Sequence, residues 1–465
     1  MAALSPMMQQ YFDIKKQHPD KILFFRLGDF YEMFYDDAIL ASKELELTLT
    51  GRDCGQEERA PMCGVPFHSY ENYVARLIAK GYKVAICEQM EDPALAKGLV
   101  KRDIIRVVTP GTVIESSMLQ DDKNNYIASI YITEKKAGVC FADVSTGTAH
   151  ATVLTGEKLG PEIISELCRY SPSEVLFNAA ILDYKEVTAY IKQQLACSVE
   201  LLDEAAFAPD ACMEEMRAQF GDAPEKTAGL APESPAFTAL AVLLGYLKET
   251  QKKGVERLKT VHNYAEAQYM QLSPVTRANL ELTETMRGRE KKGTLLWVLD
   301  KTQTAMGKRL MRAWIEQPLV NVAAINARLD GVEELVGDSV ARADIAAALS
   351  KIFDIERLMT RTVYGSASPR EIYALAATCE QLPRLKALAR PFGSAELSDI
   401  KELIFAAVDE NAPAMLKDGG VIRPGYNTEV DELRDIVHGG KGYLATLEAK
   451  LKEETGIRTL KIGYN

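Results

Sequence analysis

The sequence lacks the features of a membrane or secreted protein. Within its 465 residues no uninterrupted apolar run approaches the ~20 residues that a membrane-spanning helix needs. The first residues, MAALSPMMQQYFDIKKQ, have neither the basic start nor the apolar core of a signal peptide. A hydrophobic content of 47% and a charged content of 26% are typical of ordinary soluble domains. We therefore expect a cytoplasmic protein that makes no contact with a membrane.

Cysteine and histidine are too scattered to predict a metal site. The five histidines do not cluster with the cysteines, and no C-x-x-C pair occurs among the eight cysteines, at positions 54, 63, 87, 140, 168, 197, 212 and 379. Zinc sites and disulfide frameworks depend on such spacing. We therefore predict reduced thiols, most of them buried, and neither a metal nor a disulfide framework.

The sequence also has no excess of positive charge. Its formal net charge is −11, from 55 lysines and arginines against 66 acidic residues. Residues 1–110 alone contain 14 basic and 16 acidic residues. Because lysine and arginine supply most nucleic-acid affinity by neutralising phosphates, composition alone does not suggest DNA binding. A DNA-binding chain of this composition must gather its basic groups on one face or make a small contact.

The most informative stretch is 22–38, ILFFRLGDFYEMFYDDA. It begins as an apolar strand at 22–25 and bends at Gly28. We expect a helix from about Phe30 onward.

Asp29 and Glu32 stand at the spacing of a capping box for that helix. Four aromatic residues crowd its start, namely Phe30, Tyr31, Phe34 and Tyr35. Since a core usually takes only one or two of four neighbouring aromatic residues, at least one should face outward.

Length suggests about three domains of ~150 residues. The first, residues 1–112, alternates predicted strands and helices. Besides the central stretch it has a helix from about Ser5 to Pro19, a helix at 70–80, and strands at 45–50, 82–87 and 104–108. Strands and helices joined by short links predict a mixed sheet covered by helices.

A polar connector leads to a second α/β domain at 123–255. Its predicted strands are at 125–132, 137–144, 149–154 and 174–177, and its helices are at 161–169, 184–195 and 237–253. Asp143 raises the possibility of nuclease chemistry. No partner carboxylates stand on the neighbouring predicted strands, so we expect a surface or turn role for Asp143.

From residue 265 the pattern is predominantly helical. Predicted helices follow at 295–316, 323–336, 340–349, 355–364, 369–380, 396–408 and 429–454. Gly439, Gly440 and Gly442 interrupt the last of these, at a cost of about 1 kcal/mol each relative to alanine. The final residues, 459–465, resemble the start of a strand.

Five segments together resemble the MutS family of DNA mismatch-recognition proteins. They are GDFYEMF around Phe30, 60–93 (APMCGVPFHSYENYVARLIAKGYKVAICEQMEDP), 107–112 (VVTPGT), 276–284 (TRANLELTE) and 295–319 (LLWVLDKTQTAMGKRLMRAWIEQPL). The resemblance covers nearly the whole chain, in order and at the family's spacing.

The resemblance implies a multidomain fold with α/β and all-α parts. Residues 1–112 would form a mixed-sheet mismatch-binding domain and 123–255 a ribonuclease-H-like connector. Residues 265–390 would begin a helical core, and 391–465 would form a lever and a truncated clamp. The implied function is recognition of mispaired and small-loop DNA to initiate mismatch repair.

The family pattern assigns DNA contacts to several residues. Phe30 would insert into the duplex as a wedge, and Glu32 would hydrogen-bond to the mispaired base. Arg52 and Met62 flank a loop that would lie along the minor groove. Local charge, independently of the resemblance, suggests a further contact: a basic run, Lys97, Lys101, Arg102 and Arg106, that would track phosphates. Core packing is the alternative for Phe30, and a solvated surface is the alternative for the basic run.

No nucleotide site is expected in this chain. The nearest match to a phosphate-binding loop, around Gly307 and Lys308, has Thr302 where the first glycine is needed and Arg309 where serine or threonine is needed. We therefore predict no enzymatic activity and no cofactor here. By resemblance, ATP and Mg²⁺ would bind in a missing C-terminal part of a homodimeric protein that recruits MutL. The alternative is a MutS-like structural protein that binds branched DNA or other nucleic acid without mismatch specificity.

Overall fold

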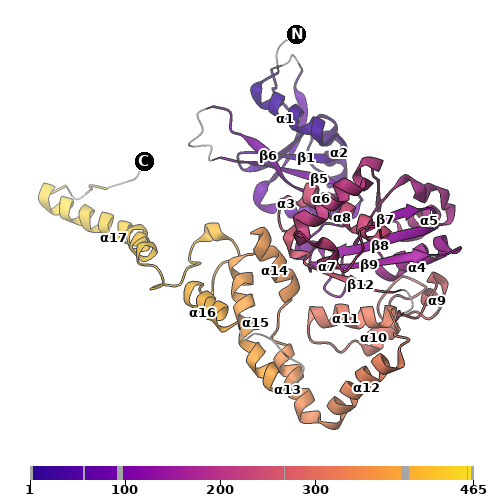
Figure 1. Ribbon diagram of the computed structural model, residues 1–465. Helices are drawn as coiled ribbons and strands as arrows, with labels where there is room; N and C mark the ends of the chain where they lie inside the picture. Colours follow the sequence, from indigo (N-terminus) through magenta and orange to yellow (C-terminus); the bar gives the residue numbers. More distant parts are fainter. Residues whose placement is uncertain are drawn as a thin grey trace. The chain divides into compact units, whose positions relative to one another are not determined.

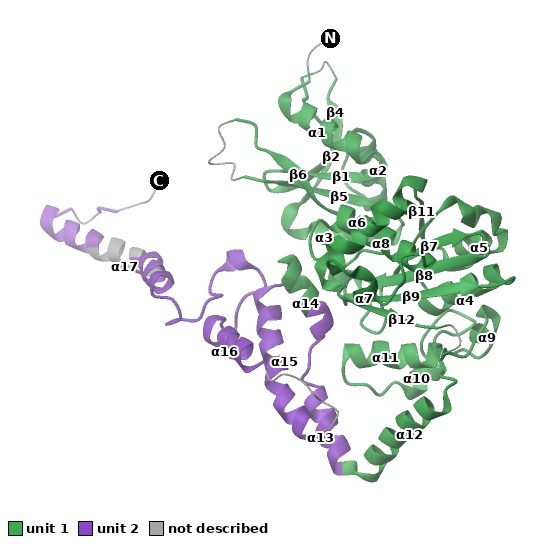
Figure 2. Ribbon diagram, viewed as in Figure 1, with its two compact units in different colours: residues 1–339, 359–365 green, residues 340–358, 366–465 purple. Residues whose placement is uncertain are grey.

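The computed structural model describes residues 4–55, 58–91, 98–265, 268–388, 397–457 and 459–461, with only the backbone for 438 and 440–446. The chain divides into two compact units (Figures 1 and 2). The first unit contains 1–339 and 359–365, and the second contains 340–358 and 366–465.

The first unit begins with a six-stranded mixed sheet of order β3-β4-β2-β1-β5-β6. Its strands are β1 (Ile22–Leu27), β2 (Phe30–Phe34), β3 (Thr50–Arg52), β4 (Ala60–Pro66), β5 (Val84–Gln89) and β6 (Arg102–Val108). Only β1 and β5 pair in parallel. The mixed sheet predicted for this region is confirmed.

Helices cover both faces of this sheet. On one face α1 (Pro6–Gln17), which begins at the N-cap Ser5, buries Met8 and Tyr11 beside Phe25 and Phe34. On the other face α2 (Tyr35–Leu45) and α3 (Tyr70–Ala79) enclose a second apolar cluster. Two separate cores therefore hold β2 from its two sides.

Two predictions for this domain are wrong. Residues 30–34 form the strand β2, and the helix α2 begins only at Tyr35. Asp29 and Glu32 therefore form no capping box. The strand predicted at 45–50 is also absent, because α2 continues to Leu45 and only Thr50–Arg52 pairs with β4.

A second six-stranded sheet follows, of order β11-β10-β7-β8-β9-β12. Its strands are β7 (Ile127–Thr133), β8 (Lys136–Asp143), β9 (Thr148–Thr155), β10 (Glu174–Phe177), β11 (Ser198–Leu201) and β12 (Thr260–Asn263). The consecutive strands β7, β8 and β9 are antiparallel, whereas β10, β11 and β12 join in parallel. This α/β arrangement agrees with the fold predicted for the second domain.

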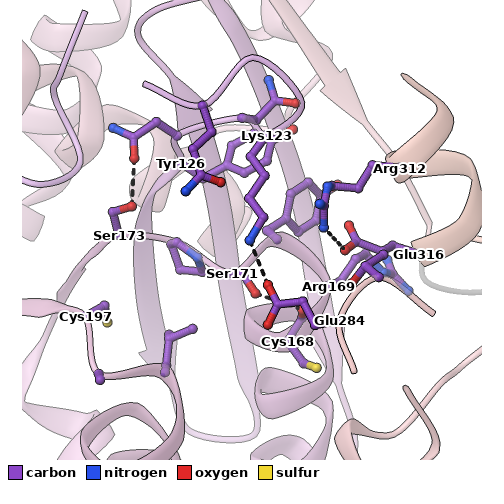
Figure 3. A pocket seen from close by; sticks show the side chains of 18 of the residues that line it. Lys123, Tyr126, Cys168, Arg169, Ser171, Ser173, Cys197, Glu284, Arg312 and Glu316 are labelled. Atoms are coloured by element: carbon purple, nitrogen blue, oxygen red, sulfur yellow. Dashed lines mark hydrogen bonds and ion pairs between the residues drawn. The ribbon is translucent and has the colours of Figure 1, made fainter. Parts of the chain in front are cut away.

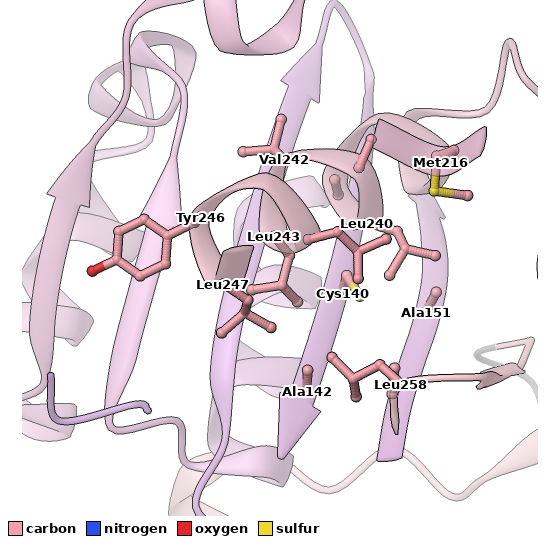
Figure 4. Close-up of a cluster of buried hydrophobic side chains, with 14 of the residues drawn as sticks. Cys140, Ala142, Ala151, Met216, Leu240, Val242, Leu243, Tyr246, Leu247 and Leu258 are labelled. Carbon is pink, nitrogen blue, oxygen red and sulfur yellow. The ribbon is translucent and has the colours of Figure 1, made fainter. Parts of the chain in front are cut away.

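The second sheet is also sandwiched between helices. One face packs on the long apolar helix α8 (Pro235–Gln251), whose Leu240, Leu243 and Leu247 lie over β8 and β9 (Figure 4). The helices α6 (Pro209–Phe220) and α7 (Pro224–Ala228) adjoin that core. The opposite face packs on α4 (Leu159–Tyr170) and α5 (Lys185–Tyr190), which correspond to the helices predicted at 161–169 and 184–195.

The remainder of the chain is helical, as predicted. The first unit adds α9 (Pro274–Asn279), α10 (Leu295–Leu299), α11 (Ala305–Glu316) and α12 (Val322–Gly337). The second unit contains most of α13 (Ser339–Leu349) together with α15 (Pro369–Leu388), α16 (Ser398–Ala407) and α17 (Thr428–Thr455). The helix α14 (Ile355–Tyr364) runs from the second unit into the first.

Three other predictions can be compared with these helices. The single helix predicted at 295–316 is interrupted between α10 and α11. The long helix predicted at 429–454 is confirmed, because α17 continues through its glycines. Of the strand predicted at 459–465, residues 462–465 lie outside the described residues, and 459–461 are not in a strand.

Two bulk expectations can also be compared. All eight cysteines are free, and six of them are buried, which confirms the prediction of mostly buried thiols. None of the described helices combines the length and the apolar character that crossing a bilayer would require.

Candidate nucleic-acid interface

The central stretch forms a tight β-hairpin that presents Phe30. Strands β1 and β2 are joined by the two residues Gly28 and Asp29, and Leu27 pairs with Phe30 across the turn. Gly28 has a φ of +56°, which a two-residue hairpin turn requires and which glycine adopts without steric cost. The carbonyl of Asp29 accepts a hydrogen bond of 2.9 Å from the Phe67 amide, which fixes the turn to the adjoining segment.

Four of the predicted site residues lie on one face of strands β2, β3 and β4. Directly opposed residues of antiparallel strands project to the same side of a sheet. Glu32 is opposite Gly64, and Arg52 is opposite Ala60. Phe30 and Glu32 are two residues apart on β2, and Met62 and Gly64 are two apart on β4. The structure therefore brings together Phe30, Glu32, Arg52 and Met62, which we call the Phe30 face.

Phe30 is the exposed aromatic residue of this face. It is 46% exposed, whereas Tyr31 is 3% exposed and Phe34 is fully buried. The prediction that at least one aromatic residue faces outward is confirmed. Phe34 continues the same side of the strand into the core under α1. The inner end of β2 is thus rigidly packed while its first ring is accessible.

Glu32 is held beside Phe30 by an ion pair. Its carboxylate accepts a hydrogen bond from Nη1 of Arg52, and the two side chains are 13% and 36% exposed. The facing residue, Gly64, has no side chain, and a Cβ there would lie 3.4 Å from Cγ of Glu32 and 3.8 Å from Cδ1 of Phe30. Glu32 and Phe30 therefore lie directly over Gly64, where a larger side chain would crowd them.

The opposite face of the hairpin is anchored by a polar cluster. The hydroxyl of Tyr31 donates a 2.7 Å hydrogen bond to Glu88, and Arg26 lies 3.3 Å from the same carboxylate. The guanidinium of Arg26 is also stacked 3.7 Å from the ring centre of Phe67. Burial first, and Glu88 second, raises the pKa of Tyr31, so the phenol stays protonated as a donor. These contacts fix the hairpin from behind.

Arg102 and Arg106 lie on β6 and are occupied by internal contacts. Arg102 is 8% exposed, and its guanidinium donates to the carbonyls of Arg26 and Val100 and to Gln10. Arg106 donates to Gln251 at 2.9 Å and pairs with Glu115. DNA contacts of Arg102 and Arg106 stay predictions. The internal hydrogen bonds argue against such contacts, because they already occupy the guanidinium groups.

The other members of the basic run are Lys97 and Lys101. Lys97 lies outside the described residues, and Lys101 is exposed. Among the described residues of this basic run, Lys101, just before β6, is therefore the one exposed cation that could contact phosphates.

The second sheet contains no arrangement suited to nuclease chemistry. Asp143 ends β8 fully buried, where it accepts hydrogen bonds from the backbone and hydroxyl of Ser145 and from Asn124 and Asn125. The predicted turn role is confirmed, but the predicted surface position is wrong. Among the residues that the structure describes, no group of three or more histidine, cysteine or acidic side chains could hold a metal ion.

Sequence reasoning missed Gly64, Pro66 and Thr50 as parts of this surface. Pro66 is opposite Phe30, and Thr50 is opposite Met62, to whose carbonyl its hydroxyl donates at 3.1 Å. Part of the signal was present, because the Gly28-Asp29 pair between two apolar runs predicts a β-hairpin. If 30–34 had been predicted as a strand, its pairing with 60–66 would have placed Gly64 and Pro66 opposite Glu32 and Phe30.

Comparison with known proteins finds three family models in order along the chain. The models described as MutS domain I, MutS domain II and MutS domain III match residues 5–117, 125–261 and 275–455. Together they account for nearly every described residue of both sheets and of the helical part.

Whole-chain relatives give the same result. The chain is 47% identical to the DNA mismatch repair protein MutS of Ruminiclostridium cellulolyticum over 475 residues, which is 100% of this chain and 54% of the relative. It is 46% identical to the protein of that name from Acetivibrio thermocellus, again with 100% of this chain and 54% of the relative. With the Clostridium tetani protein of that name it shares 44% identity, over 99% of this chain and 52% of the relative. The chain thus spans about half the length of these relatives.

Proposed function

The chain belongs to the MutS family, and on this premise we propose that its first domain recognises mispaired or small-loop duplex DNA through the Phe30 face. The observation that carries the proposal is an exposed phenylalanine next to a fixed carboxylate on a rigid sheet. Phe30 is 46% exposed, while Phe34 on the same strand is fully buried. A ring held in this way can enter the minor groove as a wedge without first being ordered.

Discrimination would arise from the cost of deforming the duplex. Inserting a side chain between base steps costs a few kcal/mol of unstacking, and the cost is lower where pairing is already defective. Phe30 therefore senses the weakness of a mispair and reads no particular sequence. This suits a protein that must find many different mispairs.

Glu32 would add a hydrogen bond to the mispaired base, next to the inserted ring. Its carboxylate accepts hydrogen bonds, so a displaced base can offer it an N–H group. A carboxylate near phosphates is otherwise repulsive, and a matched duplex that provides no N–H would be penalised. Arg52, paired with Glu32, holds the carboxylate in place and offsets part of its charge. Met62 extends the apolar part of the face.

The assignment to the wedge can be tested by fluorescence anisotropy at fixed salt. The chain and its Phe30→Ala variant are titrated against a G·T mismatch duplex and the matched duplex. Ile39→Ala is the control, because Ile39 is a 50% exposed apolar residue on α2 away from the Phe30 face. We expect Phe30→Ala to lose the preference for the mismatch, while Ile39→Ala keeps it within about a factor of 2.

Two results would reject the proposal. A Phe30→Ala variant that still prefers the mismatch would identify the residue as dispensable for recognition. Binding by the unaltered chain with no preference between the duplexes would favour the structural alternative, in which the domain binds nucleic acid without mismatch specificity. Circular dichroism of each variant shows whether the sheet is intact.

For a protein as long as these relatives, of whose length this chain spans about half, we propose the wider set of family properties. These are homodimer formation, recruitment of MutL, ATP with Mg²⁺ bound outside this chain, and a cytoplasmic location. The division into mismatch-binding (1–112), connector (123–255), core (265–390) and lever or clamp (391–465) domains belongs to the same proposal. The chain itself is proposed to bind DNA without enzymatic activity.

A further inference from the structure

The two residues of the turn that presents Phe30 are both held through their carbonyl groups. The carbonyl of Asp29 accepts a hydrogen bond from the Phe67 amide at 2.9 Å. The carbonyl of Gly28 accepts one from Nε of Arg26, which stands two positions earlier on β1. Because Phe30 follows this turn directly, the position of its ring depends on how firmly the turn is fixed.

Arg26 connects the turn to other parts of the first sheet. Its guanidinium lies 3.7 Å from the ring centre of Phe67, the residue whose amide holds the second turn carbonyl. Its Nη1 lies 3.3 Å from the carboxylate of Glu88 on β5. The backbone carbonyl of Arg26 in turn accepts a 2.7 Å hydrogen bond from Nε of Arg102 on β6. One side chain therefore links the turn to β5, and its own backbone is fixed from β6.

Arg26 lies on the side of the sheet away from the Phe30 face. It is directly opposite Tyr31 on β2, and opposed residues of antiparallel strands project to the same side. Phe30 is next to Tyr31 on the strand and so projects to the other side. The side chain of Arg26 is only 14% exposed. Arg26 would therefore affect DNA bound at the Phe30 face through the turn, and not by touching that DNA.

The cations around the large cavity of the first unit are engaged differently. Lys123 lies 2.7 Å from Glu284, and Arg312 lies 3.6 Å from Glu316, so each pairs with a carboxylate of the cavity wall (Figure 3). No residue of the Phe30 face lines this cavity. Arg26 instead donates to the backbone of the turn beside the exposed ring.

We propose that Arg26 is a positioning residue for mismatch recognition, which fixes the turn so that Phe30 enters the duplex from one already ordered position. This role rests on the function proposed for the Phe30 face. Ordering a mobile side chain and its backbone on binding costs free energy, and a fixed turn avoids that cost. The cost falls on the complex in which the ring is inserted. Loosening the turn should therefore weaken binding to a mismatch more than binding to a matched duplex.

The substitution Arg26→Lys separates the hydrogen bond to the turn from the charge. Lysine keeps a positive charge for Glu88 but has a carbon where arginine has the Nε that donates to Gly28. In the anisotropy titration, we expect Arg26→Lys to lower the affinity for the G·T mismatch duplex about tenfold, as the loss of a hydrogen bond from a charged donor implies. The affinity for the matched duplex should change by less than about a factor of 2.

Glu88→Gln makes the converse change. It removes the negative charge opposite Arg26, leaves the hydrogen bond to Gly28, and keeps an oxygen that can accept from the Tyr31 hydroxyl. Its preference for the mismatch should stay within about a factor of 2 of that of the unaltered chain.

Arg76→Lys is the matched control, because Arg76 also donates to a backbone carbonyl, that of Leu45 at the end of α2, at 3.0 Å. It should keep the mismatch preference within about a factor of 2. Hydrogen exchange of the DNA-free chain measures the turn itself. The Phe67 amide, which donates to Asp29, should exchange about tenfold faster in Arg26→Lys and at an unchanged rate in Arg76→Lys.

Any other outcome overturns the proposal. If the unaltered chain and Arg26→Lys prefer the mismatch equally, Arg26 has no positioning role and the Phe30 face keeps its proposed function. If the unaltered chain shows no preference, the function proposed for the Phe30 face fails itself. Equal losses in Glu88→Gln or Arg76→Lys, equal weakening of both duplexes, or a lost circular dichroism signal in Arg26→Lys would assign Arg26 to the fold in general. Unchanged exchange of the Phe67 amide would show that the turn does not depend on Arg26.

Discussion

At the scale of single residues, Asp143 is a buried carboxylate whose hydrogen bonds hold a turn. One oxygen accepts from the amide and hydroxyl of Ser145 at 2.9 and 2.7 Å. The other accepts from the side chain of Asn124 at 2.7 Å and the amide of Asn125 at 3.1 Å. Asp143 thus ties the end of β8 to the segment that enters the second sheet.

We predict that Asp143→Ala lowers the free energy of unfolding by about 3 kcal/mol. The substitution leaves these donors without their acceptor in a buried position, and each unsatisfied donor is costly. Urea unfolding followed by circular dichroism measures the effect. Asp183→Ala, at an exposed position, should change stability by less than about 0.5 kcal/mol. Equal stability of the two variants would contradict the structural role of Asp143.

The exposure of an aromatic side chain was easier to predict from the sequence than the hydrogen-bond partners of the arginines. The outward aromatic residue was predicted from four neighbouring rings and is Phe30. The internal use of Arg102 and Arg106 could not be predicted, because Gln10 is 92 residues from Arg102 and Gln251 is 145 residues from Arg106. A local basic run says nothing about partners so distant in the sequence.

At the scale of elements, errors occurred where local signals compete. In 30–34 the aromatic residues alternate between the two faces of β2, yet Asp29 and Glu32 imitate a helix cap. Pairing with both β1 and β4 decides in favour of the strand. Strongly patterned elements such as α8, α14 and β10 were predicted to within about two residues.

The break between α10 and α11 has a local cause that periodicity does not reveal. Asp300 accepts hydrogen bonds from the amide and hydroxyl of Thr302, at 3.3 and 2.6 Å. Thr304 then caps the new helix by accepting from the Gly307 amide at 2.9 Å. Short polar side chains thus replace helical bonds where the apolar pattern alone predicted one continuous helix.

The parallel pair β9–β12 gives the second sheet a sensitivity to acid. His150 is opposite His262, with their rings stacked 5.1 Å apart, and Tyr126 and Tyr170 also face His150. Burial first, and His262 second, lowers the pKa of His150 to about 4. The folded state therefore holds this imidazole neutral.

We predict that His150 makes the protein less stable as the pH falls from about 6.5 to 4. Between pH 6.5 and 4, His150 is protonated in the unfolded chain but stays neutral in the folded chain. The free energy of unfolding is therefore highest above pH ~6.5 and falls as the pH drops, by at most about 3 kcal/mol. Urea unfolding at several pH values should show a shallower acid dependence for His150→Gln. His68→Gln, at an exposed histidine, should keep the original slope; a slope unchanged in both variants would assign the effect to other groups.

At the scale of the molecule, the first two sheets are joined by the buried carboxylate of Glu174. This fully buried residue begins β10 and accepts hydrogen bonds from the Tyr246 hydroxyl at 2.7 Å and the Gly111 amide at 3.1 Å. Thr109 also donates to it, and Nζ of Lys83 lies 3.4 Å away. Because Lys83, Thr109 and Gly111 belong to the first sheet's part of the chain, one carboxylate connects both domains.

Removing that carboxylate should loosen the first domain from the second. Burial alone would lower the pKa of Lys83, but Glu174 and Glu200 outweigh it and raise that pKa, so the lysine is charged and needs its partners. We predict that Glu174→Ala costs about 3 kcal/mol, because the Tyr246 hydroxyl, the Gly111 amide and the Thr109 hydroxyl lose their buried acceptor, and that it accelerates tryptic cleavage after Lys123 in the connecting segment. Glu200→Ala is the matched control, because Glu200 pairs with the same lysine but is 28% exposed and should cost about 1 kcal/mol or less. Cleavage at the same rate in both variants would mean that the Glu174 carboxylate does not hold the two domains together and that apolar packing joins them.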